Sequence, residues 1–166
     1  MNSQYYIQKL NLISHPEGGY FKEVYRSDET IEKSALPGRY SGNRNFATSI
    51  YFLLEGKQFS AFHKIESDET WHFYAGTSMT LMMINEAGTY SEVIIGNNLD
   101  KNEHLQFTIK RNTWFAAKVN NENSFSLLGC TVAPGFDFDD FELADKTTLL
   151  NRFPQHEDII NEYCIR

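Results

Sequence analysis

From Tyr20 to Val132, apolar and polar residues follow one another in short runs with a period close to two, the spacing of side chains along a β-strand. Segments rich in Gly, Asn and Ser separate these runs, and no segment of helical period links them. The pattern predicts strands at 20–26, 47–54, 59–64, 70–74, 79–84, 91–95, 105–109, 114–118 and 125–132. Short strands at regular spacing without helical crossovers are typical of an antiparallel sandwich or barrel.

Near both ends of the chain, apolar residues recur with the longer spacing of a helix. The opening segment SQYYIQKLNL has a loose helical spacing, and the segment HPEGG at 15–19 ends it, because Pro cannot continue a helix and paired Gly favours a turn. After Asp140 the helical spacing returns on both sides of Pro154, which predicts two short helices packed on the outside of the sheets. No repeat or linker divides the sequence, so residues 1–166 are expected to form a single domain.

Composition and charge narrow the class of protein. A formal charge of −7 disfavours a nucleic-acid partner, since phosphate binding requires a concentrated basic surface. We expect no membrane association, because the chain has no apolar run of the length that a membrane span requires. The N-terminus lacks the pattern of a signal peptide, and Cys130 and Cys164 are far apart in sequence. These features predict a cytoplasmic protein with both thiols free.

The segment SAFHKIESDETWHFYAG at 60–76 is the strongest candidate for a functional site. If 59–64 and 70–74 form a hairpin, His63 and Glu69 can meet on its core-facing side, next to Trp71 and Phe73. An imidazole beside a carboxylate in an apolar setting is suited to acid–base chemistry near neutral pH. The alternative is an ion pair that fills a polar slot in the sheet without any catalytic role.

A metal site is the other interpretation that this spacing invites. Catalytic zinc and iron sites require three protein ligands, and His63 and Glu69 supply only two. His72 has the opposite strand parity and could join them only if a bulge shifted the register. We therefore expect no metal and no other cofactor.

The same segment resembles the first motif of the cupin superfamily, in which two His, a Glu and a closing Gly form half of a metal site. His63, Glu69 and Gly76 match the first His, the Glu and the Gly, but Ile65 stands where the second His belongs. In the region that resembles the second motif, Lys110, Asn112 and Phe115 replace the Pro, the Gly and the third His. Two of the four ligands are thus missing, and the resemblance does not imply the metal chemistry of the superfamily.

Nearly the whole chain is similar to one branch, the fifth cupin family, formerly a domain of unknown function. The matching blocks are LISHPEGGYFKEVYRS, TSIYFLL, SDETWHFYAG, WFAA and GCTVAPGFDFDDFELAD. The resemblance implies an all-β jelly-roll barrel with an open cavity, which is usually paired as a homodimer. Proteins of similar shape include deoxysugar epimerases and sugar-phosphate isomerases, as well as seed-storage and auxin-binding proteins.

Several other residues are candidates for ligand binding. Tyr20 and Arg26 share one face of the first strand, and an inward-facing Arg would suit a carboxylate or phosphate. Thr48 and Tyr51 lie on opposite faces of their strand, so at most one of them can serve the cavity. The rings of Trp71 and Phe73 could form a flat apolar wall for a sugar or a nucleobase, although ordinary core packing also explains them.

Two functions remain open at this point. The first is a metal-independent, epimerase-like enzyme in which His63 is the base and Glu69 orients it or acts as a second acid. The second is a protein that binds a small polar ligand, sugar-like or carboxylate-bearing, without converting it.

The segment GFDFDDFE at 135–142 alternates Phe and Asp residues. We expect its Phe side chains to pack the segment on the barrel and its Asp side chains to stay solvated.

Overall fold

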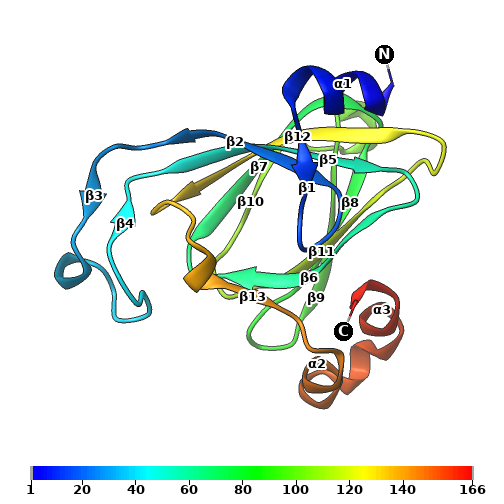
Figure 1. The fold of residues 1–166 in the computed structure, drawn as a ribbon. Coiled ribbons are helices and arrows are strands. Elements are labelled where there is room, and N and C mark those ends of the chain that lie inside the picture. Colours follow the sequence, from blue (N-terminus) through cyan, green and yellow to red (C-terminus); the bar gives the residue numbers. More distant parts are fainter. Residues whose placement is uncertain (1, 166) are drawn as a thin grey trace.

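The computed structural model describes residues 2–165 and contains two antiparallel sheets that face each other (Figure 1). The larger sheet has the order β1 (Ile13–Ser14), β2 (Tyr20–Arg26), β5 (Thr48–Glu55), β12 (Phe125–Ala133), β7 (Asp68–Gly76) and β10 (Gln106–Ile109). The smaller sheet has the order β13 (Phe141–Leu143), β6 (Phe59–Ile65), β11 (Trp114–Val119), β8 (Met79–Ile84) and β9 (Tyr90–Ile95). All the predicted strands are present, and the jelly-roll architecture is confirmed.

The predicted hairpin of 59–64 and 70–74 is wrong. The strand β6 pairs with β11 and β13 in the smaller sheet, whereas β7 pairs with β10 and β12 in the larger sheet. The short turn between them therefore crosses from one sheet to the other, as happens repeatedly in a jelly roll. His63 and Glu69 consequently approach the interior from opposite walls.

The main core lies between the two sheets and is built from their inward-facing side chains. Fully buried examples are Phe52, Trp71, Leu81 and Phe115. Because both sheets contribute alternate residues to this layer, the period of two in the sequence becomes one apolar face on each sheet.

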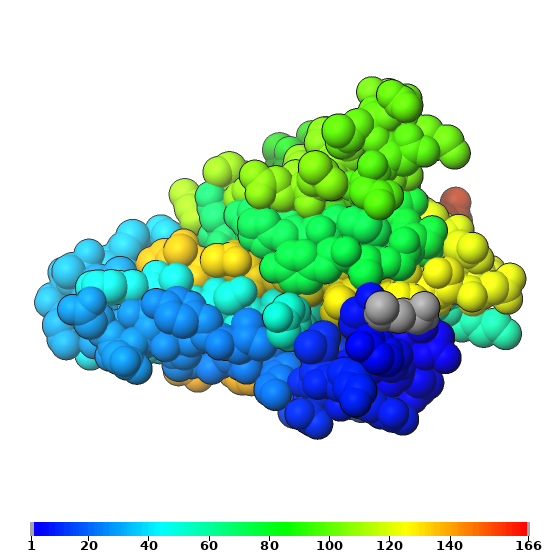
Figure 2. Space-filling view, turned by 90° about the horizontal axis from the view of Figure 1, so that it is seen from above, coloured from blue at the N-terminus to red at the C-terminus, as the bar shows by residue number. Residues whose placement is uncertain are grey.

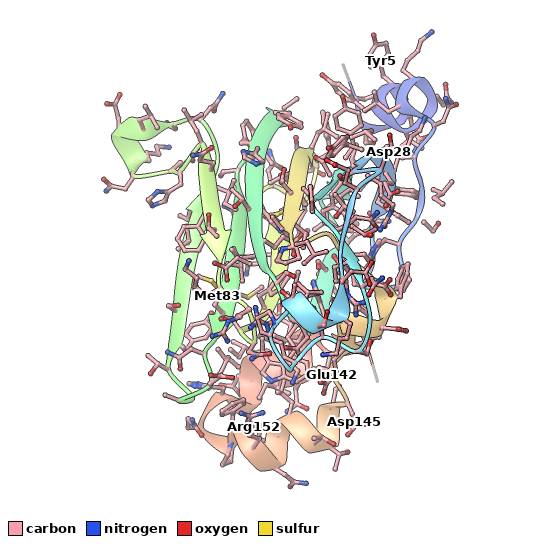
Figure 3. The ribbon with its side chains drawn as sticks, turned by 90° about the vertical axis from the view of Figure 1, so that its left-hand side faces the viewer. Tyr5, Asp28, Met83, Glu142, Asp145 and Arg152 are labelled. Carbon is pink, nitrogen blue, oxygen red and sulfur yellow. The ribbon has the colours of Figure 1, made fainter. Side chains whose placement is uncertain are left out.

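Helices cover the outer faces at opposite ends of the molecule. Helix α1 (Ser3–Leu10) begins at Asn2, whose side chain accepts a hydrogen bond from the Tyr5 N–H, and ends at Asn11 in the left-handed conformation. Its apolar face packs on the larger sheet. Helices α2 (Lys146–Arg152) and α3 (Glu157–Tyr163) pack on the smaller sheet, as predicted. Figure 3 shows Tyr5 of α1 at one end and Arg152 of α2 at the other.

Residues 27–46 form an arm that projects from one edge of the sheets (Figures 1 and 2). The arm contains strands β3 (Thr30–Ile31) and β4 (Arg44–Asn45) and the short 3-10 helix η1 (Lys33–Ala35). The remaining 3-10 helices are η2 (Leu99–Lys101), η3 (Phe138–Asp140) and η4 (Pro154–His156). Within residues 2–165, no helix has the length and apolar character required to cross a membrane.

Candidate functional site

A cavity opens between the two sheets near the base of the arm and encloses about 670 Å³, counted together with the part of its mouth that is open to solvent. Its walls are mainly apolar and aromatic, with phenylalanines from the region after β12, and its polar groups come from the loop after α1 and from both sheets. The lining side chains are those of His15, Glu17, Phe21, Glu23, Arg26, Thr48, Ile50, Phe52, His63, Ile65, Glu69, Trp71, Cys130, Val132, Phe136, Phe138 and Phe141.

The turn predicted at HPEGG brings Glu17 into this cavity. Gly18 and Gly19 have positive φ angles of 116° and 73°, which side chains rarely adopt. A Cβ atom at Gly18 would lie 2.1 Å from the Phe59 carbonyl oxygen, so this close approach to β6 requires glycine. The Glu17 carbonyl then accepts a hydrogen bond from the Ala61 N–H at 2.8 Å, which ties the loop to the strand.

A β-bulge in β6 presents the partners of Glu17. His63 pairs with Phe115 and Ser60 pairs with Ala117, so β6 advances three residues while β11 advances two. The bulge changes the parity of the strand and turns both Ser60 and His63 toward Glu17. The Ser60 hydroxyl donates to Glu17 Oε1 at 2.8 Å, and His63 Nε2 lies 3.0 Å from Glu17 Oε2.

A hydrogen bond to the backbone fixes the tautomer of His63 in this cluster. His63 Nδ1 lies 2.7 Å from the Ala61 carbonyl oxygen, and since a carbonyl only accepts, Nδ1 carries a proton. Burial lowers the pKa of His63 to about 3 and raises that of Glu17 well above its usual value. The neutral ring therefore presents a lone pair at Nε2, and the raised pKa of Glu17 favours a protonated carboxyl that donates to it.

His15 completes the inner polar cluster in a neutral state. Its Nδ1 accepts a hydrogen bond from the Glu17 N–H at 3.3 Å, and burial lowers its pKa to about 4. Its ring packs against Phe21, with 4.6 Å between ring centroids. Two neutral imidazoles thus lie beside Glu17, and neither supplies a positive charge at neutral pH.

Glu69 enters the cavity from the opposite sheet. It is buried, and desolvation raises its pKa to about 7, although the Trp71 indole N–H and the Cys130 thiol nearby act in the opposite direction. The Trp71 N–H lies beside this carboxyl, but it makes no hydrogen bond of normal geometry with any residue from 2 to 165. The carboxyl of Glu69 also raises the pKa of Glu17, so the two acids are close enough to influence each other.

The mouth of the cavity is aromatic and contains an ion pair between Arg26 and Glu23. Arg26 donates to both carboxylate oxygens of Glu23, at 3.0 and 2.7 Å, and also to Asn45 Oδ1 and the Phe136 carbonyl. Thr48 Oγ1 accepts a hydrogen bond from the Phe136 N–H, which holds the segment after β12 in place. The rings of Phe136, Phe138 and Phe141 contact one another edge to face at the rim.

The structure brings some of the predicted site residues together and separates others. His63, Glu69, Arg26, Thr48 and Trp71 all line the cavity. The residue that contacts His63 is Glu17, however, and no ion pair or hydrogen bond joins His63 to Glu69 among the described residues.

The other three predicted ligand-binding residues do not line the cavity. Tyr20 and Tyr51 pack under helix α1 on the outer face of the larger sheet. Phe73 faces inward, as predicted, but packs against the main core away from the cavity walls. Tyr51 fails as a candidate because its strand parity places it on the face opposite Thr48. The expectation that Tyr20 shares a face with Arg26 is wrong, because a β-bulge between Glu23 and Tyr25 changes the parity of β2 and leaves Tyr20 on the outer face.

Comparison with known proteins identifies the family. The family model "Cupin superfamily (DUF985)" matches residues 4–144. The chain belongs to this cupin family. The match covers the HPEGG loop, β6, β7 and the Phe-rich rim, so all parts of the cavity lie within the family domain.

Three similar proteins have names that state no function. A hypothetical protein from Leishmania major is 31% identical and has a TM-score of 0.91, with 100% of both chains covered. Protein SO0799 from Shewanella oneidensis is 36% identical, with a TM-score of 0.89 and coverage of 99% and 98%. The uncharacterized yeast protein YML079W is 30% identical over 146 residues, which is 82% of this chain and 72% of the yeast protein.

More distant cupins share only the fold. Oxalate decarboxylase from Bacillus subtilis has a TM-score of 0.55 at 13% identity, covering 90% of this chain and 36% of the enzyme. This similarity confirms the jelly-roll architecture.

The side chains at the metal positions of this cupin do not fit a metal. Ile65 and Phe115 occupy positions that the superfamily motifs assign to His, and the Phe115 ring packs on His63 with 4.0 Å between centroids. Of the two ligands that remain, His63 and Glu69, the first has its Nε2 atom facing Glu17. Among residues 2–165, no group of three or more His, Cys, Asp or Glu side chains has a geometry that could hold a metal ion.

Sequence reasoning missed the roles of several cavity residues in this cupin. His15 and Glu17 were assigned only to a turn, although an acid between Pro and paired Gly in a tight loop was a usable signal. The phenylalanines at 136, 138 and 141 were expected to pack the segment on the barrel, and they also form the rim. Asp140, expected to be solvated, is buried against Arg44.

Proposed function

We propose that this cupin binds a small organic molecule in the cavity between its sheets. One observation carries the proposal: four separate parts of the chain converge on an aromatic-walled cavity that holds Glu17, His63 and Glu69. Concave, mostly apolar pockets with a few converging polar groups are typical of small-molecule sites.

The energetic cost of burying carboxyl groups in the cavity favours a binding role for them over a purely structural role. Burying a carboxyl away from water is unfavourable unless it is well paired, and two carboxyls near each other add to the cost. Glu69 has no cationic partner among the described residues, and its pKa is raised to about 7. A group held at such cost in an open cavity is a candidate for ligand recognition.

Proton transfer on the bound molecule, as in an isomerase or epimerase, is a second candidate. It is favoured by the pKa of Glu69, since an acid or base is most effective when its pKa lies near the working pH. Glu69 would then exchange the proton directly. His63, whose two ring nitrogens are engaged by Ala61 and Glu17, would be a positioning residue for Glu17 and not the base.

The two tryptophans of the chain provide a direct test of binding. Trp71 lines the cavity, whereas Trp114 packs under the C-terminal helices and serves as an internal reference. In a fragment screen read by two-dimensional ¹H–¹⁵N NMR, cavity ligands should shift the Trp71 indole signal and leave that of Trp114 unchanged. A Trp114→Phe variant assigns the two signals.

A matched pair of surface truncations sharpens this test. Phe138 is 57% exposed and lies on the rim, and Phe46 is 47% exposed and does not line the cavity. We expect Phe138→Ala to weaken the binding of cavity fragments several-fold and Phe46→Ala to leave it unchanged. A screen in which no fragment shifts Trp71 contradicts the binding function.

Solvent-deuterium incorporation separates binding from proton transfer. If the second function holds, cavity ligands that carry a carbonyl should gain deuterium from D2O in the presence of the protein, and Glu69→Gln should stop the exchange. Ligands that bind and return unlabelled leave binding as the only function.

The predicted homodimer and the cytoplasmic location remain predictions. Light scattering at micromolar concentration checks the first, and cell fractionation checks the second.

A further inference from the structure

The polar groups inside the cavity are almost entirely acidic or neutral. The titratable side chains that face it are Glu17 and His15 from the HPEGG loop, Glu23 and Arg26 from β2, His63 from β6, Glu69 from β7 and Cys130 from β12. Arg26 is the single cation among them, and Glu23 neutralises it with two hydrogen bonds at the mouth. The inner part of the cavity therefore has two carboxyls and no compensating charge.

The surroundings of Glu69 suit its ionised form, provided that a positive charge arrives. The Trp71 indole N–H and the Cys130 thiol lie beside its carboxyl as donors. The Trp71 side chain is 1% exposed, and its N–H lacks a partner of normal geometry within residues 2–165. An ionised Glu69 is a stronger acceptor than a neutral one and could take this hydrogen bond, since charge-assisted bonds are shorter and stronger.

The aromatic walls of the cavity also favour a positively charged ligand. Five aromatic rings line the cavity, those of Phe52, Trp71, Phe136, Phe138 and Phe141. Aromatic faces attract cations, and in a desolvated pocket this attraction is larger than at a surface. An anion entering the same space would meet aromatic faces and two carboxyls without any free cation.

From these contacts we propose that the cavity selects a small molecule with a basic nitrogen on an apolar or aromatic body, whose N–H groups pair with Glu69, and that it rejects carboxylates and phosphates. This inference rests on the proposed binding function and names its ligand class. It replaces the sugar-like or carboxylate-bearing ligand that the sequence favoured, because Arg26, the residue that suggested an acid, is already neutralised.

Three probes of similar shape test this selectivity: benzylamine, benzyl alcohol and benzoate. Their dissociation constants are measured from the Trp71 indole shift at pH 7.5, with Trp114 as the reference signal. We expect benzylamine to bind at least about tenfold more tightly than benzoate, with benzyl alcohol between them, because only the amine supplies the missing charge.

The variant Glu69→Gln removes the charge and keeps the shape of the side chain. It should reduce the affinity for benzylamine at least several-fold and leave that for benzyl alcohol nearly unchanged, which also confirms that the variant is folded. Glu122→Gln, at an exposed position outside the cavity, changes the net charge equally and should alter none of the three constants.

The pH dependence of the benzylamine affinity tests whether Glu69 binds the amine, because a Glu69 with a purely structural role would not alter it. Amine binding favours the carboxylate, so below pH 7 it should release a proton, and the benzylamine affinity should rise between pH 5.5 and 7.5. The affinity for benzyl alcohol should not rise over this range, and the pH dependence for benzylamine should be lost in Glu69→Gln.

The possible failures are distinguishable. If benzoate binds as tightly as benzylamine, or if only neutral and anionic fragments shift Trp71, the charge selectivity is wrong and the binding function stands. If no fragment of any charge shifts Trp71, both the binding function and the selectivity are overturned.

Discussion

Two buried polar pairs in this cupin join distant parts of the chain, and they differ in how their charges are balanced. Arg44 in the arm and Asp140 after β12 form a two-point ion pair, with Nε to Oδ2 at 2.6 Å and Nη2 to Oδ1 at 2.5 Å. Glu17 and His63 share a single proton and remain neutral together.

The difference separates a structural contact from a candidate binding site. Arg44 also donates to the Asn43 carbonyl and to Ser41, so each of its three guanidinium nitrogens is hydrogen-bonded and its charge is balanced by Asp140. The inner acids of the cavity, Glu17 and Glu69, have no ion pair with Lys or Arg among the described residues, and both line the open cavity. The complete Arg44–Asp140 pair fixes the arm to the segment after β12, whereas the neutral Glu17–His63 pair leaves the neighbouring Glu69 without a compensating charge.

Breaking the complete pair should produce the largest effect. Arg44→Met removes the partner of a carboxylate whose side chain is 4% exposed, and leaving a buried charge unpaired costs about 3–5 kcal/mol. Urea denaturation at pH 7 measures the loss. The double variant Arg44→Met with Asp140→Leu is the control, because replacing both partners by apolar groups should recover most of the stability. A loss below about 1 kcal/mol in the single variant contradicts the structural role.

The pH dependence of stability should reveal the uncompensated Glu69. Its pKa is raised from 4.5 to about 7 on folding, so its neutral form stabilises the native state below pH 4.5. This contribution is lost as the pH rises to 7, because the unfolded chain releases its proton first. The loss amounts to about 3 kcal/mol, taken at 1.36 kcal/mol per pKa unit.

Comparison with Glu69→Gln isolates this contribution. His15 and His63, with folded pKa values of about 4 and 3, oppose it, because they destabilise the native state as the pH falls below 6.5. The difference in unfolding free energy between the wild type and Glu69→Gln cancels the histidine terms. This difference should fall steadily from pH 4.5 to 7, and a constant difference contradicts the raised pKa.

The fold was predictable because its signal is local. Alternation of apolar and polar residues within each strand sets which face is buried, and this places every predicted strand and both terminal helical regions correctly. The pairing of strands is not local, and the hairpin of β6 with β7 was wrong because consecutive strands of a jelly roll can belong to different sheets.

The site was only partly predictable, for two physical reasons. The contact of Glu17 with His63 joins a loop to a strand that lies far along the chain, and nothing in the spacing of either segment specifies it. The bulge in β6 also reverses the parity that the sequence implies, so Ser60 joins His63 on the cavity side and Phe59 packs with the outer helices. Strand parity predicted Glu69 and Trp71 correctly because β7 is regular at those residues.

Replacing Glu17 by Gln should have a much smaller effect than breaking the Arg44 pair. The amide N–H₂ group can donate to His63 Nε2 as the protonated carboxyl does, and the amide oxygen can still accept from Ser60. We expect a loss of about 1 kcal/mol or less at pH 7, measured by urea denaturation. If Glu17 were ionised and His63 charged, the same substitution would cost several times more, comparable with Arg44→Met.

Opening the ion pair at the mouth should have the smallest effect on stability and a specific effect on selectivity. The side chains of Arg26 and Glu23 are 37% and 40% exposed, and exposed pairs contribute about 0.2–1 kcal/mol. Glu23→Gln should therefore alter the unfolding free energy little, but it frees the guanidinium next to the Phe136 carbonyl. An unpaired Arg is a good partner for a carboxylate, so the affinity for benzoate should rise several-fold while that for benzyl alcohol stays the same. An unchanged benzoate affinity would indicate that the two inner carboxyls, and not the neutralised Arg26, determine which charge can enter.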